Sequence, residues 1–197
     1  MPFIFKRLAL FLSIAAAFAA DKKEFRAPAA SAFAHKQTNE QLTIGAEPYV
    51  NGQKVRVAFG KVVPYDYGVL PVLVVMQNDT GKTVRLDRMK VAYAGPRGDR
   101  VEETPAKEVR FAVAPQRPRA MGSGRGPLPL PPKKNPLSEW EIEGRALSAL
   151  MITAGQSASG FVYFQTGLQR GATIYISGIA DATSGKEFFY FEIPLEQ

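Results

Sequence analysis

Acidic side chains offer the first chemistry to consider in this chain, because a pair of carboxylates can carry out acid–base hydrolysis. Glu139, Glu141 and Glu143 lie close together at the first turns of a predicted helix, where negative side chains complement the helix dipole. Asp66, next to two tyrosines and a glycine, is the better isolated candidate, although this setting is also typical of a turn. We therefore predict no catalytic residue and keep a carboxylate-based hydrolase near Asp66 as the alternative.

The chain has few residues suited to act as a nucleophile or to bind a metal ion. The chain has no cysteine and a single histidine, His35, which argues against thiolate sites, His-rich metal centres and a Ser-His-Asp triad. Ser157 and Ser159 lack the Gly-x-Ser-x-Gly setting of a nucleophile. Asp79 and Asp87 lack the dense oxygen-ligand spacing of a calcium loop. We predict no metal site and no cofactor.

A proline-rich segment, residues 112–136, contains seven prolines and no acidic residue. So many missing backbone donors exclude a sheet interior, and we expect a long surface loop with polyproline II character. Its basic side chains form a candidate anion-attracting loop: Arg117, Arg119, Arg125, Lys133 and Lys134. The alternative is a solvated loop kept soluble by its charge. Without a recognition motif, we expect no nucleic-acid partner.

The carboxy-terminal hairpin carries the candidate partner-binding residues. Alternation over residues 172–179 and 186–194 places aliphatic and some aromatic side chains in the core: Ile174, Ile176, Phe189, Phe191 and Ile193. The same alternation predicts three rings on the outer face, namely Tyr175, Phe188 and Tyr190. These rings could contact a partner protein or stack on sugar. In the alternative, a helix over residues 138–151 covers them with Trp140.

The amino terminus has the pattern of an export signal. Lys6 and Arg7 precede an apolar run over residues 8–18, and Ala17-Phe18-Ala19 matches a small-x-small cleavage site. The run is too short to cross a bilayer, so we predict a cleaved signal peptide, residues 1–19, and a periplasmic or secreted protein. A buried amino-terminal helix or an uncleaved anchor is the alternative.

The elements that must position these residues are mostly short strands in a single domain, residues 41–197, after a flexible tail, residues 20–40. Predicted strands cover residues 42–46, 53–63, 68–76, 83–93, 159–165, 172–179 and 186–194. The strand at 68–76 is apolar in both phases, which indicates the centre of a sheet. Ser138 and Glu141 fit the capping box of the predicted helix over 138–151. We expect a mainly β, antiparallel two-sheet sandwich with one inserted helix and a long Pro-rich loop.

Two segments, residues 69–81 and 153–164, resemble uncharacterised bacterial exported domains with an immunoglobulin-like sandwich fold. The first has an apolar strand that leads to Asn78 and a polar turn, and the second has a Gly-polar-small-Gly stretch before an apolar strand. The resemblance implies an exported accessory role and assigns no catalytic or ligand residue. We expect a non-catalytic module that binds an envelope protein or an anionic or sugar polymer. The alternatives are the hydrolase above and a purely structural part of an envelope assembly.

Overall fold

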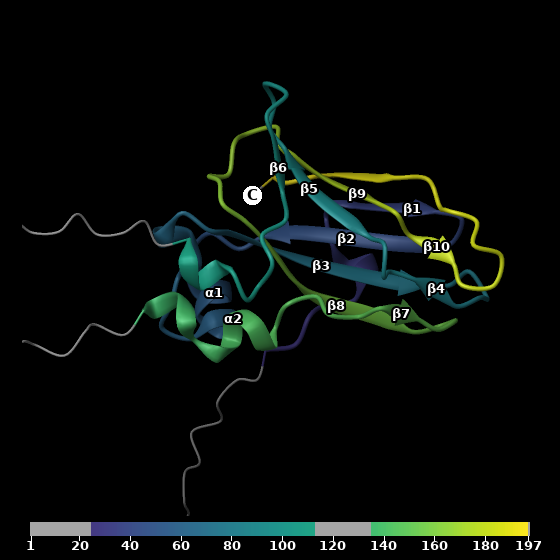
Figure 1. Cartoon of the computed structure of the whole chain (residues 1–197), viewed down its shortest axis with the longest axis horizontal. Coiled ribbons are helices and arrows are strands. Elements are labelled where there is room, and N and C mark those ends of the chain that lie inside the picture. The colour runs from purple at the N-terminus through teal and green to yellow at the C-terminus, as the bar shows by residue number, and fades with distance from the viewer. Residues whose placement is uncertain (1–24, 113–134, 197) are drawn as a thin grey trace, which may run out of the picture.

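The structure, a computed structural model, describes residues 25–112 and 135–196. Eleven strands of the described residues form three antiparallel sheets, and the helices among them are short (Figure 1). The predicted signal peptide and the five basic residues of the Pro-rich loop lie outside the described residues. The mainly β, antiparallel character predicted from the sequence is confirmed.

Two four-stranded sheets form the body of the protein. Sheet 1 has the order β1 (Lys36–Asn39), β2 (Leu42–Pro48), β3 (Leu70–Asn78) and β8 (Ser157–Phe164). Sheet 2 has the order β11 (Phe191–Pro194), β9 (Thr173–Ser177), β5 (Lys90–Ala94) and β6 (Arg100–Glu102). A third, small sheet joins β10 (Ala180–Asp181), β4 (Val84–Arg85) and β7 (Met151–Ile152).

Strand β3 lies inside sheet 1 and contacts a hydrophobic cluster on each face. Val72 and Val74 belong to the cluster shared with sheet 2, which also contains Ile174 of β9. Leu73 and Val75 belong to a second cluster, formed with the helices on the other face of sheet 1. A strand apolar in both phases is buried on both faces, and the prediction of a central strand is confirmed.

One of the helices that pack on sheet 1 comes from a segment predicted to be a strand. Helix α1 (Gly52–Phe59) occupies most of the predicted strand over residues 53–63, so that prediction is wrong. Val55, Ala58 and Phe59 are all buried, and their spacing of three and four residues places them on one helix face against sheet 1. Alternating Val55, Val57 and Phe59 also fit a strand, and the contacts with the second cluster favour the helix.

The segment expected to be a flexible tail packs onto sheet 1 from residue 25 onward. Ala30 and Phe33, in and after a 3-10 helix at Ala30–Ala32, are buried in the second cluster. Strand β1 then pairs with β2, and Lys36 is opposite Gly45. A Cβ atom at Gly45 would lie 2.6 Å from the Phe33 ring, so glycine permits this close packing. The prediction for residues 25–40 is therefore corrected.

The predicted helix over residues 138–151 is also corrected. Helix α2 (Trp140–Gly144) is short, and no side chain caps its first turn. A 3-10 helix at Pro136–Ser138 precedes it, and the Asn135 side chain accepts from the Leu137 backbone. After Gly144 the backbone bonds to the edge of β8: Phe161 N–H donates to the Arg145 carbonyl, and Leu147 N–H donates to the Phe161 carbonyl. Because the backbone of residues 145–147 bonds to this strand edge, helix α2 does not continue to residue 151.

The predicted strand over residues 83–93 is divided between two sheets. Its first part is β4, which pairs with β10 and β7, and its second part is β5 of sheet 2. The break between these two strands lies near Arg88, where Gly178 packs against the Arg88 backbone with a φ of +74°. The polar turn at residues 78–81 therefore leads from β3 of sheet 1 to β4 of the third sheet.

The ends of the Pro-rich segment lie close together. A 3-10 helix at Val109–Phe111 contacts the one at Pro136–Ser138, and both Val109 and Leu137 are buried in the second cluster. Asn135 Nδ2 donates to the Arg110 carbonyl at 2.6 Å. The described flanks thus anchor both ends of the segment to the domain.

Among residues 25–112 and 135–196, no helix has the length and apolar character to cross a membrane.

Candidate binding surface

Two of the three predicted partner-binding rings lie together on the outer face of sheet 2. Ile174 and Ile176 of β9 point into the core, so Tyr175 between them faces outward. Its ring stacks on Tyr190, with ring centroids 4.9 Å apart and planes at 26°. The Arg100 guanidinium lies 4.9 Å from the Tyr175 centroid. Arg100, Tyr175 and Tyr190 are called the Tyr surface below.

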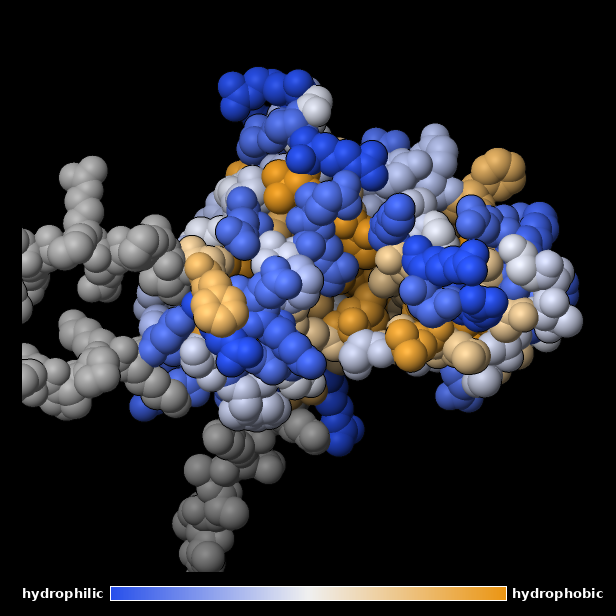
Figure 2. All heavy atoms as spheres, viewed as in Figure 1, coloured by the Kyte–Doolittle hydropathy of each residue, from blue (hydrophilic) through white to orange (hydrophobic). Residues whose placement is uncertain are grey.

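The sheet register explains how the Tyr surface is supported. Ala92 of β5 is opposite Tyr175 of β9, and Arg100 on β6 reaches over β5 to the same ring. Ala92 is buried although it belongs to the outer face, because these larger side chains cover it. Tyr190 is 50% exposed, so part of its ring is open to solvent. The charged tip of the β5–β6 hairpin projects beyond this sheet (Figures 1 and 2).

Side chains of β1 in sheet 1 hold the segment around Tyr190. Asn39 Nδ2 donates to the Tyr190 carbonyl at 3.1 Å, and the Gln37 side chain accepts from Glu192 N–H at 2.7 Å. These two side chains of β1 bond to the outer edge of β11 and so close one side of the sandwich. They also fix the backbone around Tyr190, which stabilises the position of its ring.

Phe188, the third predicted ring, lies elsewhere. It is half-buried against the core cluster, and its N–H donates to the Ile179 carbonyl at 2.8 Å. Residues 188–190 are not a strand, so the predicted alternation fails there. Phe189, predicted in the core, is 74% exposed, whereas Phe191 and Ile193 are fully buried as predicted.

Trp140 does not cover the Tyr surface. Its ring lies 5.5 Å from the Arg145 guanidinium, helix α2 contacts α1, and Trp140 is 65% exposed. Arg145 donates to the Val57 and Ala58 carbonyls at the end of α1, which explains the position of this cation. The alternative in which the Trp140 helix covers the tyrosines is therefore wrong.

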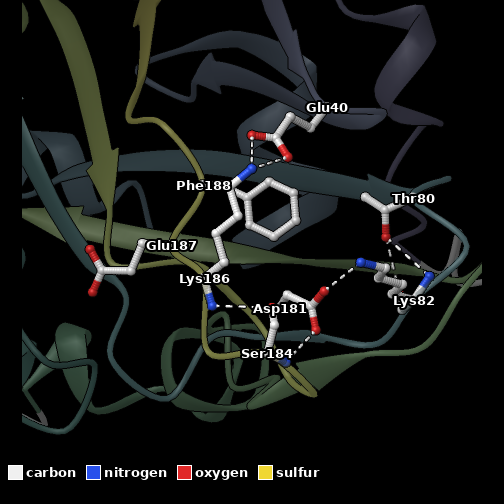
Figure 3. A pocket seen from close by; sticks show the side chains of 8 residues that line it. All are labelled: Glu40, Thr80, Lys82, Asp181, Ser184, Lys186, Glu187 and Phe188. Carbon is white, nitrogen blue, oxygen red and sulfur yellow. Dashed lines mark hydrogen bonds and ion pairs between the residues drawn. The ribbon is translucent and has the colours of Figure 1, made fainter.

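Phe188 lines a small pocket where three loops meet at the end of the sheets (Figure 3). Its volume is about 130 Å³. We call it the Asp181 pocket, and its lining consists of Glu40, Thr80, Lys82, Asp181, Ser184, Lys186, Glu187 and Phe188.

Two ion pairs order the walls of the Asp181 pocket. Lys82 Nζ lies 3.0 Å from Asp181, and Lys186 Nζ lies 3.1 Å from both Glu40 oxygens. Asp181 also accepts from the backbone of Thr183 at 2.7 Å and Ser184 at 3.1 Å. The Ser184 bond, the Lys82 bond and the Thr183 bond hold the Asp181 pKa well below its usual range. The Asp181 side chain is therefore ionised throughout the physiological pH range.

The other predicted candidates take up turn and helix-end positions. Asp66 is exposed in the first turn of a 3-10 helix at Pro64–Tyr67, before Gly68 with a φ of +80°. Glu141 and Glu143 occupy the first turn of α2, as the sequence predicted. In the part of the chain that the structure describes, no three His, Cys, Asp or Glu side chains are grouped to hold a metal ion.

Glu103 is a group that sequence reasoning missed. It is half-buried where the chain leaves β6: its N–H donates to Val91, and the next residue, Thr104, donates to the Tyr163 carbonyl in sheet 1. Burial raises the pKa of Glu103 to about 7. Local sequence gave no signal, because distant strands create this burial.

Comparison with known proteins finds only weak similarity to solved structures. No family model and no curated protein matches the chain. Solved structures similar to it include the ycdA protein of Bacillus subtilis, at 14% identity and a TM-score of 0.38 over 81% of this chain. The yjhA protein of B. subtilis is 10% identical, with a TM-score of 0.41 over 83% of this chain and 98% of its own. The secreted protein MPT63 of Mycobacterium tuberculosis is 12% identical, with a TM-score of 0.30 over 80% of this chain and 89% of its own. The chain spans 38% of the length of the ycdA protein.

Proposed function

We propose that this chain is an exported, non-catalytic module with an immunoglobulin-like sandwich fold, which binds an envelope or extracellular component through the Tyr surface. The observation that carries the proposal is the half-exposed Tyr190 ring, stacked on Tyr175 and fixed by bonds from β1. Tyr and Arg are the residue types that dominate binding energy at protein interfaces. A ring already held in place loses little conformational freedom when a partner binds.

Several features support the finer parts of the proposal. Sheets 1 and 2 are antiparallel and share one core cluster, which is the packing expected of a sandwich. Lys6 and Arg7, followed by the apolar run 8–18, support export. The non-catalytic role is supported by Asp66, whose exposed turn position matches a structural use of its side chain.

Quantitative affinity capture tests this function. The mature chain and its Tyr190→Ala variant are immobilised and exposed to an envelope extract, and the bound component is identified and measured. Tyr67→Ala is the matched control, because Tyr67 is 40% exposed in a 3-10 helix outside sheet 2. Loss of an aromatic anchor of about 2 kcal/mol weakens capture roughly 30-fold. Equal capture by the wild type and Tyr190→Ala contradicts the proposal, as does the absence of any captured component.

A further inference from the structure

We propose that the Asp181 pocket is a binding site for one neutral polyhydroxylated ring, such as a single sugar unit. The site is separate from the Tyr surface and goes beyond the function proposed above. Three parts of the chain build it: the turn that contains Glu40, the loop with Thr80 and Lys82, and the loop from Asp181 to Phe188 (Figure 3).

The walls offer donors and acceptors side by side. The Lys82 and Lys186 side chains are 65% and 67% exposed, and each ammonium contacts one carboxylate while it carries three N–H donors. Both Glu40 oxygens and Asp181 Oδ2 contact one lysine each and keep a further lone pair, whereas Asp181 Oδ1 accepts from the Thr183 and Ser184 amides. A hydroxyl group donates and accepts at once, so neighbouring hydroxyls on a ring match this alternation.

The charge of the lining favours a neutral ligand over an ion. Its two lysines stand against three acids, Glu40, Asp181 and Glu187, so the pocket has a slight negative excess and no attraction for an anion. A metal cation would face both ammonium groups. A neutral hydrogen-bonding ring meets neither form of repulsion.

Size and the Phe188 ring limit the ligand further. A volume of about 130 Å³ accommodates one ring partly inserted. Phe188 is half-buried and supplies the apolar wall, on which the C–H face of a sugar can stack. Asp181 is almost wholly buried and held by two backbone amides, so the polar wall is rigid.

Titration followed by amide NMR tests the site. The folded protein is titrated separately with methyl glucoside, N-acetylglucosamine, myo-inositol and inorganic phosphate. The proposal predicts saturable shifts at the Thr80, Lys82 and Ser184 amides with at least one of the three neutral ligands. For a ligand this small, the dissociation constant is expected to be of the order of millimolar. Saturable shifts with phosphate alone, or no saturable shift with any probe, would overturn it.

A pair of lysine variants locates the binding. Lys186→Met removes a donor of the pocket, whereas Lys54→Met removes an equally exposed lysine, 68% against 67%, that is ion-paired to Glu47 elsewhere. Because Lys186→Met loses a charged donor of the pocket, we expect it to bind the ligand about tenfold more weakly. The Lys54→Met protein keeps that donor and is expected to bind with wild-type affinity. Glu40→Gln keeps the shape of the wall but removes its charge, and this variant is also expected to bind the ligand more weakly. Equal affinity in all variants would show binding outside the pocket. Tyr190→Ala leaves these shifts intact, so failure here and failure at the Tyr surface are distinguishable.

Discussion

Glu103→Gln is expected to stabilise the protein at alkaline pH and to have no effect at acidic pH. The Glu103 carboxyl has an ordinary pKa of 4.5, and burial raises it to about 7 in the folded protein. Between these values the folded chain binds the proton and the unfolded chain releases it. The free energy of unfolding therefore falls as pH rises from about 4.5 to about 7, and the loss is complete above that range.

The magnitude follows from the same two values. A displacement from 4.5 to about 7 corresponds to about 3 kcal/mol. Because the carboxyl is only half-buried, solvent screening lowers this to about 2 kcal/mol. The nearby Tyr163 hydroxyl donates to the Ile142 carbonyl at 2.7 Å and stays protonated throughout, since burial raises its pKa far above neutrality. Glutamine mimics the protonated acid and is immune to this loss.

Thermal melts at pH 5 and pH 8 measure the effect. At pH 8 the Glu103→Gln variant is expected to melt roughly 4–8 °C above the wild type. At pH 5, only slightly above the ordinary pKa of 4.5, the difference in melting temperature is expected to be less than half as large. Glu108→Gln, an exposed acid nearby, is the control and should change neither melt. A stabilisation of equal size at both pH values would refute the reasoning, because it would not depend on the charge.

Four further outcomes follow from the chain. Phe191→Ala truncates a fully buried ring and is expected to lower the free energy of unfolding by about 3–5 kcal/mol in denaturant titrations; near-wild-type stability would contradict the core assignment. Replacing residues 113–134 with a short Gly-Ser link should barely move the melting temperature, because each doubling of loop length costs only about 0.6 kcal/mol; failure to fold would show that the segment packs into the core. The same deletion should remove any salt-sensitive binding to polyanions, measured by retention on heparin at two ionic strengths; unchanged retention would exclude the anion-attracting loop. Mass spectrometry of the exported chain should find Ala20 at its amino terminus, and an intact Met1 would exclude cleavage.

The sequence correctly predicts strands in which the spacing of apolar residues matches the faces that are buried. Strand β3 is apolar in both phases and lies at the centre of a sheet, and Ile174 and Ile176 alternate into the core as expected. Helix α1 shows the limit of this reasoning, because Val55 and Phe59 fit both a strand period and a helix spacing of four. Contacts with the second cluster, which no local pattern reveals, decide between the two.

The candidate sites were predictable to a smaller extent. Tyr175 follows from alternation in a real strand, and Tyr190 stacks on it because the chain returns beside that strand. Phe188 and Phe189 precede the strand β11, so alternation could not place them. The Asp181 pocket joins residues more than 100 positions apart, such as Glu40 and Lys186, and only the fold brings them together.

Photo-crosslinking at position 190 tests the central claim most directly. A benzoylphenylalanine side chain replaces Tyr190 in the exported protein, or replaces Tyr67 in a parallel control, and the intact cells are irradiated. The account predicts one defined adduct with an envelope or extracellular component from position 190 and none from position 67. The same adducts from both positions, or none from either, would contradict binding at the Tyr surface.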